Sequence, residues 1–318
     1  MFGRICLLCM LFLFSGAALA QGQTPNSAIN YFEHGNKRYN QGDLDGAITD
    51  FTRAIEISSH PALSKLLRNT SAAGVNAFFN SDDPDGNVNV IDPFTAQALI
   101  SRGLAFLKKG DIDHALADFD RAIRINPGFA EAYVDRGGAR YAQGDTERAL
   151  ADWNKAIQMN SKLAAAYLNR GALFIQMGKI DAAFADLDKA IALDRKEAKA
   201  YGHRGFAWMM RKDFDRAISD FSIAINLDSS LAWLFDGRGA ARIARNELEP
   251  AIADFNHALQ LDPGLAIAYV NRGLALLLQG KEAEAARDFE QALAINPDLK
   301  GELNRSVKTV SELRAGKQ

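Results

Sequence analysis

Seven aspartates recur along the chain at one register, and six of them follow an arginine by sixteen residues. The aspartates are Asp50, Asp118, Asp152, Asp186, Asp220, Asp254 and Asp288. A carboxylate can act as a general base, but an active site occurs once in a chain, whereas these residues are copied into every period. The pattern therefore predicts a ladder of structural ion pairs. Because partly exposed pairs contribute little stability each, we expect this ladder mainly to set register.

The arginines belong to an Arg-Gly dipeptide that returns every 34 residues from Arg102-Gly103 to Arg272-Gly273. His34-Gly35 lies two periods before the first of these dipeptides. A fixed period of this length indicates a stacked array of helical repeats rather than a compact enzyme domain. Numbered from an alanine, the periods are 28–61, 96–129, 130–163, 164–197, 198–231, 232–265 and 266–299.

Within each of these periods, small and large residues keep fixed positions. Position 8 is always glycine, positions 20 and 27 are always alanine, and position 24 is always large and apolar. Positions 4, 8 and 11 share one helix face, and positions 20, 24, 27 and 28 share the face of a second helix. A break such as Gly144-Asp145 can end the first helix with glycine and cap the second with aspartate. Since a glycine inside a helix costs roughly 1 kcal/mol, we expect close helix approach at position 8, with the alanines opposite.

This pattern resembles the tetratricopeptide repeat family over 28–61 and 96–299. The resemblance implies an all-α fold, a right-handed superhelical solenoid of antiparallel helix pairs in which stacked neighbours bury a continuous core. The tail, 300–318, carries four apolar residues at helical spacing and predicts a capping helix over the last repeat. Those four residues are Leu303, Val307, Val310 and Leu313.

The segment 62–95 fills one period but lacks its marks, so it is either a degenerate repeat or an insertion. Its residues 81–92 resemble a calcium loop of the EF-hand kind, in which oxygen ligands alternate around a glycine. The candidate ligands are Asp83, Asp85, Asn89 and Asp92, with Gly86 at the turn. Ser81 and Asp92 depart from the usual Asp and Glu of such loops, and an ordinary acidic turn also explains the composition. Calcium therefore stays open, and we expect no other cofactor.

Residues 1–20 have the features of a secretory signal peptide, with Arg4, an apolar stretch and the Ala18-Leu19-Ala20 cleavage pattern. An uncleaved anchor is the alternative, although the apolar stretch is short for a membrane span. Both cysteines, Cys6 and Cys9, fall inside this leader. The mature chain would then contain no disulfide, thiol nucleophile or thiolate metal site. We therefore expect an exported protein, in the periplasm or alternatively secreted.

The charge balance argues against a nucleic-acid partner. Removing 1–20 takes away one of the 37 basic residues and none of the 39 acidic residues, so the mature net charge is 36 − 39 = −3. A nucleic-acid-binding domain usually carries a basic patch or stripe, and this chain has no basic run. No segment after the leader has the length and apolarity of a membrane helix.

In the family that the chain resembles, the first helix of each repeat lines a concave face. Carried onto this sequence, the middle of that face is mainly apolar, which suits an extended peptide or an amphipathic helix. Its residues are Tyr141, Ala165, Leu168, Asn169, Ile175, Lys199, His203, Phe206, Met209, Trp233 and Ile243. We take seven of them as candidate partner-binding residues: Tyr141, Asn169, Ile175, Lys199, His203, Phe206 and Met209.

Some relatives clamp a peptide's C-terminal carboxylate with lysines and asparagines of successive first helices. Asn169 and Lys199 match two of those positions, and His203 replaces a basic residue at a third. Val134 and Gly138 occupy the remaining two positions and cannot donate side-chain hydrogen bonds. The resemblance therefore implies at most an incomplete clamp.

No set of residues indicates catalysis. The five histidines are scattered through different periods, and neither a phosphate loop nor a nucleophile elbow is present. The sequence therefore predicts a non-catalytic scaffold that binds a protein or peptide. An accessory recruiting subunit of an envelope enzyme or of an export complex is one alternative. A small-molecule, glycan or calcium-linked binding protein is the other, and the oligomeric state stays open.

Overall fold

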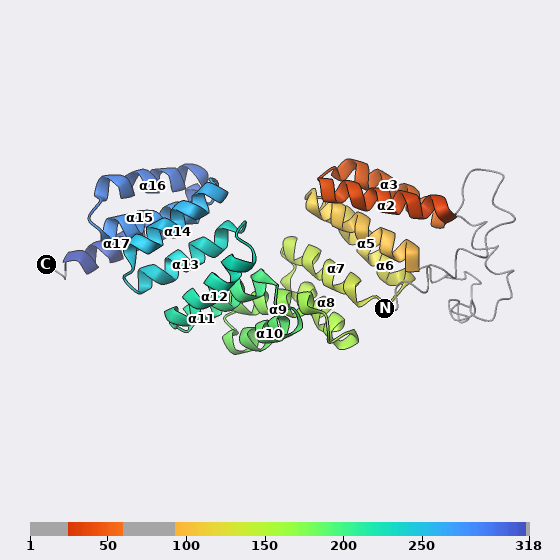
Figure 1. Ribbon diagram of the computed structural model, residues 1–318, viewed down its shortest axis with the longest axis horizontal. Helices are drawn as coiled ribbons and strands as arrows, with labels where there is room; N and C mark the ends of the chain where they lie inside the picture. The colour runs from red at the N-terminus through yellow and green to blue at the C-terminus, as the bar shows by residue number, and fades with distance from the viewer. Residues whose placement is uncertain (1–24, 60–92, 316–318) are drawn as a thin grey trace. The chain divides into compact units, whose positions relative to one another are not determined.

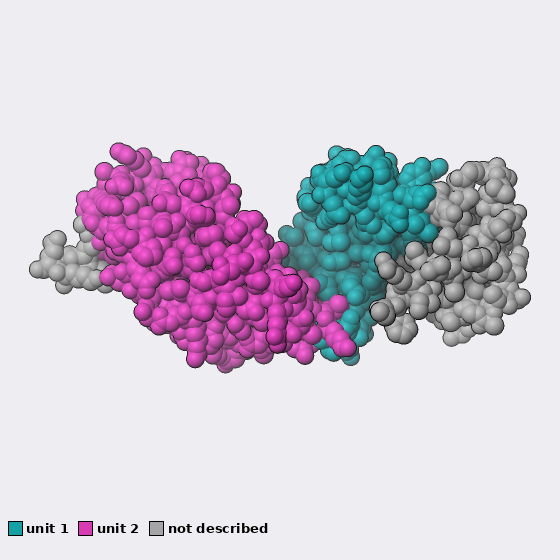
Figure 2. Space-filling view, in the orientation of Figure 1, with its two compact units in different colours: residues 1–161 teal, residues 162–318 magenta. Residues whose placement is uncertain are grey.

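The computed structural model describes residues 25–59 and 93–315, and every regular element in those ranges is a helix (Figure 1). The chain divides into two compact units at residues 161 and 162 (Figure 2). The first unit contains α2 (Pro25–Gln41), α3 (Leu44–Ser58), α5 (Pro93–Lys108), α6 (Ile112–Ile125), α7 (Ala130–Ala142) and α8 (Thr146–Met159). The predicted all-α solenoid of paired helices is confirmed.

The second unit continues the same alternation of helices. It contains α9 (Ala164–Gln176), α10 (Ile180–Leu193), α11 (Ala198–Met210), α12 (Phe214–Leu227), α13 (Ala232–Ala244), α14 (Leu248–Leu261), α15 (Ala266–Leu278), α16 (Glu282–Ile295), a short 3₁₀ turn (Pro297–Leu299) and α17 (Lys300–Ala315). The first helix of each pair, α2, α5, α7, α9, α11, α13 or α15, is called its A helix, and the second its B helix.

Each unit curves toward its A helices. Every A helix packs along its own B helix, and within a unit each B helix packs against the next A helix. Consecutive A helices also touch, α2 with α5 and α5 with α7 in the first unit, and α9 with α11, α11 with α13 and α13 with α15 in the second. Among the described helices, consecutive B helices make no contact of similar extent. The A helices therefore form the inner side of each unit.

The turns within the helix pairs follow their sequence signals. Five glycines at this turn have positive φ angles between 70° and 87°, and Lys212 and Asn246 adopt φ of 60° where the glycine is replaced. Aspartates after the turn cap the B helices, as Asp145 does by accepting a hydrogen bond from the Arg148 backbone N–H at 3.0 Å. The left-handed residue and the cap together end one helix and begin the next.

The glycine at position 8 makes room for the large residue at position 24 rather than for an alanine. A Cβ atom on Gly137 would lie 2.5 Å from Nε1 of Trp153, and one on Gly239 would lie 2.6 Å from the Phe255 ring. The same overlap occurs in every described repeat, at 2.4 to 3.0 Å. The close approach expected at position 8 is therefore present, but the atoms nearest the glycine belong to the residue at position 24 and not to the buried alanines at positions 20 and 27.

The first and second repeats are direct neighbours although a whole period separates them in sequence. Helix α3 packs against α5 as α6 packs against α7. Arg102 Nη1 donates to Thr52 Oγ1 at 2.9 Å, and Lys109 pairs with Asp45, in the register of the later repeats. Helices α3 and α5 are therefore adjacent in the stack. Most of 62–95, including the calcium-like loop 81–92, lies outside the described residues, as does the leader 1–20.

The array ends in helix α17, which packs against α15. Leu303 and Val310 of α17 are buried against the last repeat, with Val307 beside them. This is the covering role that the apolar spacing of the tail predicts. No helix in the described ranges is both long and apolar enough to cross a membrane.

The neighbouring glycines of α7 provide a matched test of the packing at position 8. Gly137→Ala places a methyl group inside the Trp153 indole, so we expect a loss of roughly 1–3 kcal/mol in the free energy of unfolding. Gly138→Ala meets nothing within 4 Å and removes a helix-interior glycine, so we expect a gain of up to about 1 kcal/mol. Urea unfolding followed by tryptophan fluorescence measures both changes. Equal effects of the two substitutions would contradict the packing described above.

Candidate functional site

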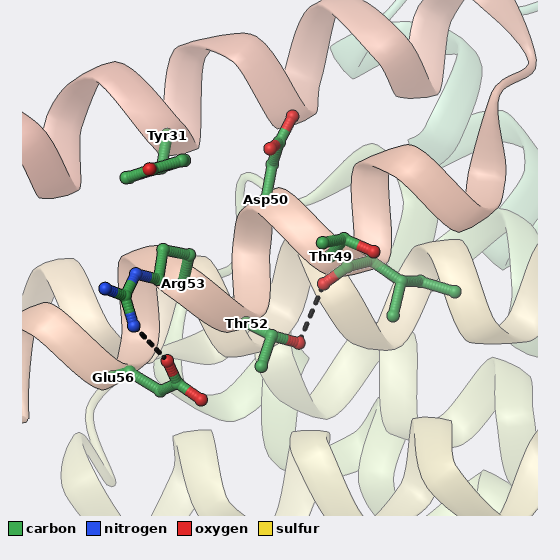
Figure 3. Close-up of a pocket in the computed structure, with 7 residues that line it drawn as sticks. Tyr31, Thr49, Asp50, Thr52, Arg53 and Glu56 are labelled. Carbon is green, nitrogen blue, oxygen red and sulfur yellow. Dashed lines mark hydrogen bonds and ion pairs between the residues drawn. The ribbon is translucent and has the colours of Figure 1, made fainter.

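A pocket of about 430 Å³ lies at the pair α2 and α3, lined by Tyr31, Ile48, Thr49, Asp50, Thr52, Arg53 and Glu56 (Figure 3). Arg53 and Glu56 form an ion pair with each other at 3.0 Å, and Thr52 donates its hydroxyl to the Ile48 carbonyl. These contacts occupy much of the pocket's polar lining. The Thr49 hydroxyl likewise donates to the Asp45 carbonyl, at 2.9 Å.

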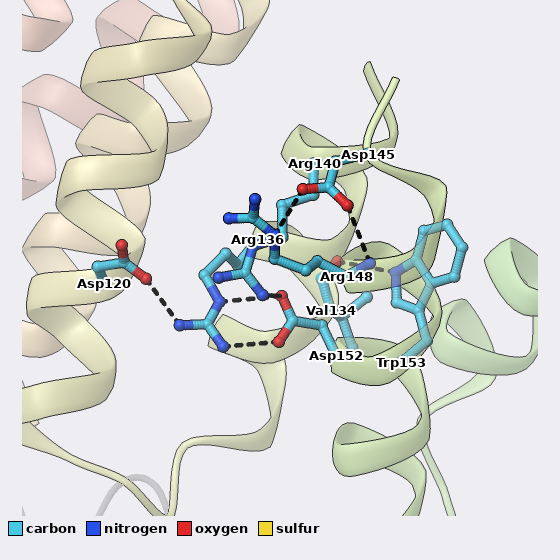
Figure 4. Close-up of polar contacts among 8 residues, drawn as sticks. All are labelled: Asp120, Val134, Arg136, Arg140, Asp145, Arg148, Asp152 and Trp153. Carbon is cyan, nitrogen blue, oxygen red and sulfur yellow. Dashed lines mark hydrogen bonds and ion pairs between the residues drawn. The ribbon is translucent and has the colours of Figure 1, made fainter. Parts of the chain in front are cut away.

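The recurrent carboxylates are structural, and six of the seven, all but Asp50, bind an arginine of their own repeat through two hydrogen bonds. Arg136 donates from Nε and Nη2 to the two carboxylate oxygens of Asp152, at 2.9 and 2.6 Å (Figure 4). The same geometry, with distances of 2.6 to 3.0 Å, holds for five further pairs: Arg102–Asp118, Arg170–Asp186, Arg204–Asp220, Arg238–Asp254 and Arg272–Asp288. The fork of the guanidinium matches a carboxylate in this way.

The remaining guanidinium nitrogen reaches the preceding repeat. Arg136 Nη1 donates to Asp120 at 2.7 Å, and Arg204 Nη1 donates to Asp188 at 2.7 Å. In Arg204, the hydrogen bonds to Asp220 and Asp188 raise the pKa of the guanidinium further above its usual value, against the lowering that burial causes. Within each unit, these arginines therefore join their own helix pair to the one before it, as the predicted ladder requires.

The ladder is more buried than the sequence pattern indicates. The aspartates are only 3 to 6% exposed, because their own helix pair and the arginine side chain cover them. Two arginines at position 11 add to the cover, since Arg140 donates to Asp152 at 2.7 Å and Arg242 donates to Asp254 at 2.6 Å. The expectation of partly exposed pairs holds for the arginines, whose side chains are 14 to 23% exposed, but not for the aspartates. Removing one partner of such a pair leaves a buried charge uncompensated, which is strongly destabilising.

The first repeat departs from the ladder because His34 stands in place of the arginine. Its Nδ1 lies 2.8 Å from Asp50 Oδ2, and Arg38 Nη1 lies 3.3 Å from the same oxygen. Neither contact is aligned as a hydrogen bond to that buried atom. An imidazole has no forked pair of donors, so the first helix pair lacks the two-bond clamp that every later pair has.

The candidate partner-binding residues lie on A helices of both units. Tyr141 is on α7 in the first unit and is 36% exposed, with its ring 6.1 Å from that of Trp153. The other six are on α9 and α11 in the second unit. There Lys199 is exposed, and five side chains are half-buried: Asn169, Ile175, His203, Phe206 and Met209.

An aromatic cluster joins α11 to α13 on the A-helix face, which we define as positions 2, 5, 6, 9, 12 and 13 of the A helices. The Trp233 ring stacks on His203 at 5.3 Å and on Phe206 at 5.9 Å between centroids. It also lies directly on Gly202, where a Cβ atom would meet the indole at 2.4 Å. The structure thus brings two of the predicted residues together around Trp233, and Gly202 makes that approach possible.

The geometry of Asn169, Lys199 and His203 gives little support to a clamp for a peptide's C-terminal carboxylate. Burial, together with the nearby Lys199 ammonium, lowers the pKa of His203 to about 4. His203 is therefore uncharged at neutral pH, which leaves Lys199 as the one cation among the three matching residues. Asn169, on α9, has no hydrogen bond to either of them in the described part of the chain.

Sequence reasoning did not single out two carboxylates on the A-helix face. Asp236 of α13 is 9% exposed and accepts a hydrogen bond from Asn271 of α15 at 2.9 Å. Burial raises its pKa to about 6, and the bond to Asn271 opposes that rise. In the first unit, burial and then Glu131 raise the pKa of Asp135 to about 7. A repeat-by-repeat comparison could have found Asp236, because position 5 carries no charge in the other six repeats.

The repeats match known families directly. Residues 96–129 and 266–299 match one Tetratricopeptide repeat family, 164–197 match a second, and 137–178 and 239–280 match the family described as TPR repeat. The chain belongs to the tetratricopeptide repeat family. A comparison with curated proteins finds no match to this TPR sequence.

Solved structures share the fold at low sequence identity. A tetratricopeptide repeat protein from Parabacteroides merdae is 22% identical with a TM-score of 0.59, covering 89% of this chain and 99% of its own. Cut9, in its complex with Hcn1, is 19% identical with a TM-score of 0.63, covering 84% of this chain and 52% of its own. PilF from Pseudomonas aeruginosa is 18% identical with a TM-score of 0.56, covering 64% of this chain and 92% of its own. These similarities concern the TPR fold alone.

The TPR chain carries no constellation typical of catalysis in its described ranges. No group of three or more histidine, cysteine, aspartate or glutamate side chains there could hold a metal ion. TPR proteins are in general scaffolds for protein–protein interaction, and the A-helix face is the surface on which this one carries half-buried aromatic side chains.

Asp236→Asn tests the burial of that carboxylate through the pH dependence of stability. The pKa of about 6 in the folded protein lies above the usual value near 4, so ionisation of Asp236 opposes folding. This destabilisation is absent below about pH 4 and develops as the pH rises through 6. We expect the variant to be more stable than the parent at pH 7, on the order of 2 kcal/mol, and equally stable below pH 4.

Urea unfolding between pH 3.5 and 8 measures this difference. Asp262→Asn is the control, because that carboxylate is exposed at the end of α14 and its loss leaves the same net charge. A stability difference for Asp236→Asn that does not vary with pH would contradict a raised pKa.

Proposed function

We propose that this TPR protein is a non-catalytic scaffold whose A-helix face, in the second unit, binds a peptide or helix of a partner protein. The observation that carries the proposal is the cluster of Phe206, Trp233 and His203, half-buried on that face and held in place by Gly202. Aromatic side chains that stay accessible while rigidly held are typical anchors for a bound segment. Met209 and Ile175 continue the apolar strip along α11 and α9.

The ion-pair ladder supports this assignment because it uses a different set of positions. The Arg–Asp pairs occupy positions 7 and 23 of the repeats, and these two positions therefore stabilise the stack of helix pairs. Positions 2, 5, 6, 9, 12 and 13 take no part in that ladder and are free to vary in type. The similar fold of Cut9, which forms a hetero-tetramer with Hcn1, is an instance of such a frame serving in a protein assembly.

We further propose that the protein acts outside the cytoplasm, in the periplasm. The supporting features are the leader-like composition of 1–20 and the absence of cysteine after Cys9. Expression of the full chain in a Gram-negative host, followed by periplasmic extraction and intact-mass measurement, tests this. The expected mass corresponds to a chain that begins at Gln21. Recovery of the full-length mass from the cytoplasm would contradict export.

A photo-crosslinking amino acid placed at single positions tests the binding face. With the crosslinker at Met209, on the A-helix face, we expect discrete crosslinked products from envelope extract. With it at Leu261, 42% exposed at the end of α14, we expect none of these products. Mass spectrometry identifies the crosslinked segment, and circular dichroism checks that both proteins fold.

A second substitution, Phe206→Ser, tests whether the aromatic cluster contributes to the interaction. Added to the Met209 crosslinker, it should reduce the same products several-fold, because it removes part of the aromatic anchor. Equal crosslinking at Leu261 and Met209 would place the interaction elsewhere. Absence of products at both positions would count against a scaffold that acts through this face.

A further inference from the structure

Asp236 is a buried carboxylate for which the described part of the chain supplies no ion-pair partner. Its side chain lies on α13 and is 9% exposed, with Oδ1 held by the neutral amide of Asn271. No ion pair to Asp236 is present in residues 25–59 and 93–315. A desolvated carboxylate is unfavourable unless a positive charge or several hydrogen bonds compensate it, and this one has a single neutral partner.

The other buried aspartates of the second unit show what compensation looks like in this protein. Asp220 and Asp254 each accept two hydrogen bonds from an arginine of their own repeat. Asp236 differs from them in place as well as in partner. It occupies position 5, on the A-helix face, where the other repeats carry apolar residues or glycine.

The charged and titratable groups near Asp236 in the described helices do not compensate its negative charge. Helix α11 contributes His203, which is uncharged at neutral pH because burial and Lys199 lower its pKa to about 4. Lys199 is exposed, and its charge acts on His203 and Asp228. Helix α15 contributes the neutral Asn271. On the A-helix face of the second unit, Asp236 and Lys199 are the charged residues.

The neighbour of Asp236 along its own helix is an aromatic ring. Trp233 precedes it by three residues, so the two side chains share one side of α13. The indole is fixed by stacking on His203 and Phe206 and by its contact with Gly202. A carboxylate beside a fixed aromatic ring suits a side chain with an apolar stem and a cationic tip, which is the chemistry of lysine and arginine.

We propose that Asp236, Trp233 and Asn271 form a subsite for a lysine or arginine side chain of the segment that binds the A-helix face. The stem packs along Trp233, and the cationic group bonds to the carboxylate that Asn271 orients. This assignment rests on the proposed function and adds to it the chemistry of the partner. The bound segment is then mainly apolar and carries a basic residue at a fixed place.

Selection from a phage-displayed library of random twelve-residue peptides tests the subsite. The targets are the mature chain, the Asp236→Asn variant and the Asp262→Asn control. We expect the parent and the control to select peptides with a basic residue at one aligned position. The Asp236→Asn variant should select the same apolar positions without that preference.

The pH dependence of binding separates recognition from a merely structural role. For a selected basic peptide, the affinity of the parent should rise about tenfold between pH 5 and pH 7, because a carboxylate with a pKa near 6 ionises over that range. The Asp236→Asn variant should show a flat profile, as should the parent with the same peptide carrying norleucine in place of the basic residue. Calorimetry or fluorescence anisotropy measures each affinity.

The outcomes distinguish this inference from the function on which it depends. If none of the targets selects a peptide, the proposed function fails and the subsite falls with it. If peptides are selected but lack a basic position, or if Asp236→Asn retains that preference, the subsite alone is overturned. A flat pH profile for the parent with a basic peptide would overturn it as well.

Discussion

The arginine at position 7 is the contact on which the rest of the array depends. Two of its nitrogens bind the aspartate of its own repeat, and within a unit the third reaches a side chain of the repeat before it, as Arg136 reaches Asp152 and Asp120. The aspartate is buried, so it requires that guanidinium to avoid an uncompensated charge. A helix pair therefore completes its own polar core only with its arginine in place, and the same arginine fixes the distance and register of the preceding layer.

This constraint acts between nearest neighbours in the stack, and α3 and α5 satisfy it directly although residues 59–92 separate them in sequence. The bridge from Arg102 to Thr52 and the pairing of Lys109 with Asp45 are the contacts that adjacent repeats make elsewhere. Because stability in such arrays is a sum of repeat and interface terms, the direct packing of α3 on α5 keeps the interface term between these two helix pairs. The cost of closing a longer loop grows only slowly with its length.

The period of the sequence was sufficient to predict the helix pairs, their turns and the partners of the ladder. It was not sufficient to predict burial, which depends on side chains from more than one helix. The aspartates were expected to be partly exposed because their spacing reveals only the arginine at position 7. It does not reveal the arginine at position 11 or the helix pair that covers them. Alanines were expected opposite Gly137 because both residue types are small. In the structure, the large Trp153 indole fills the space next to the glycine. Asp236 was overlooked for a related reason, since attention to residues shared by all repeats passes over the position at which one repeat differs.

That difference separates two kinds of buried carboxylate in one protein. Asp220 receives its cation from Arg204 within the same repeat, and the two-bond geometry of this pair is the same as in five others. Asp236 receives only an amide from the next repeat, on the face that takes no part in the ladder. A carboxylate whose role was purely structural would be served best by a guanidinium, as Asp220 is, or would be replaced by an apolar residue, as is usual at position 5. Its retention without either one places a specific electrostatic demand on whatever covers this face.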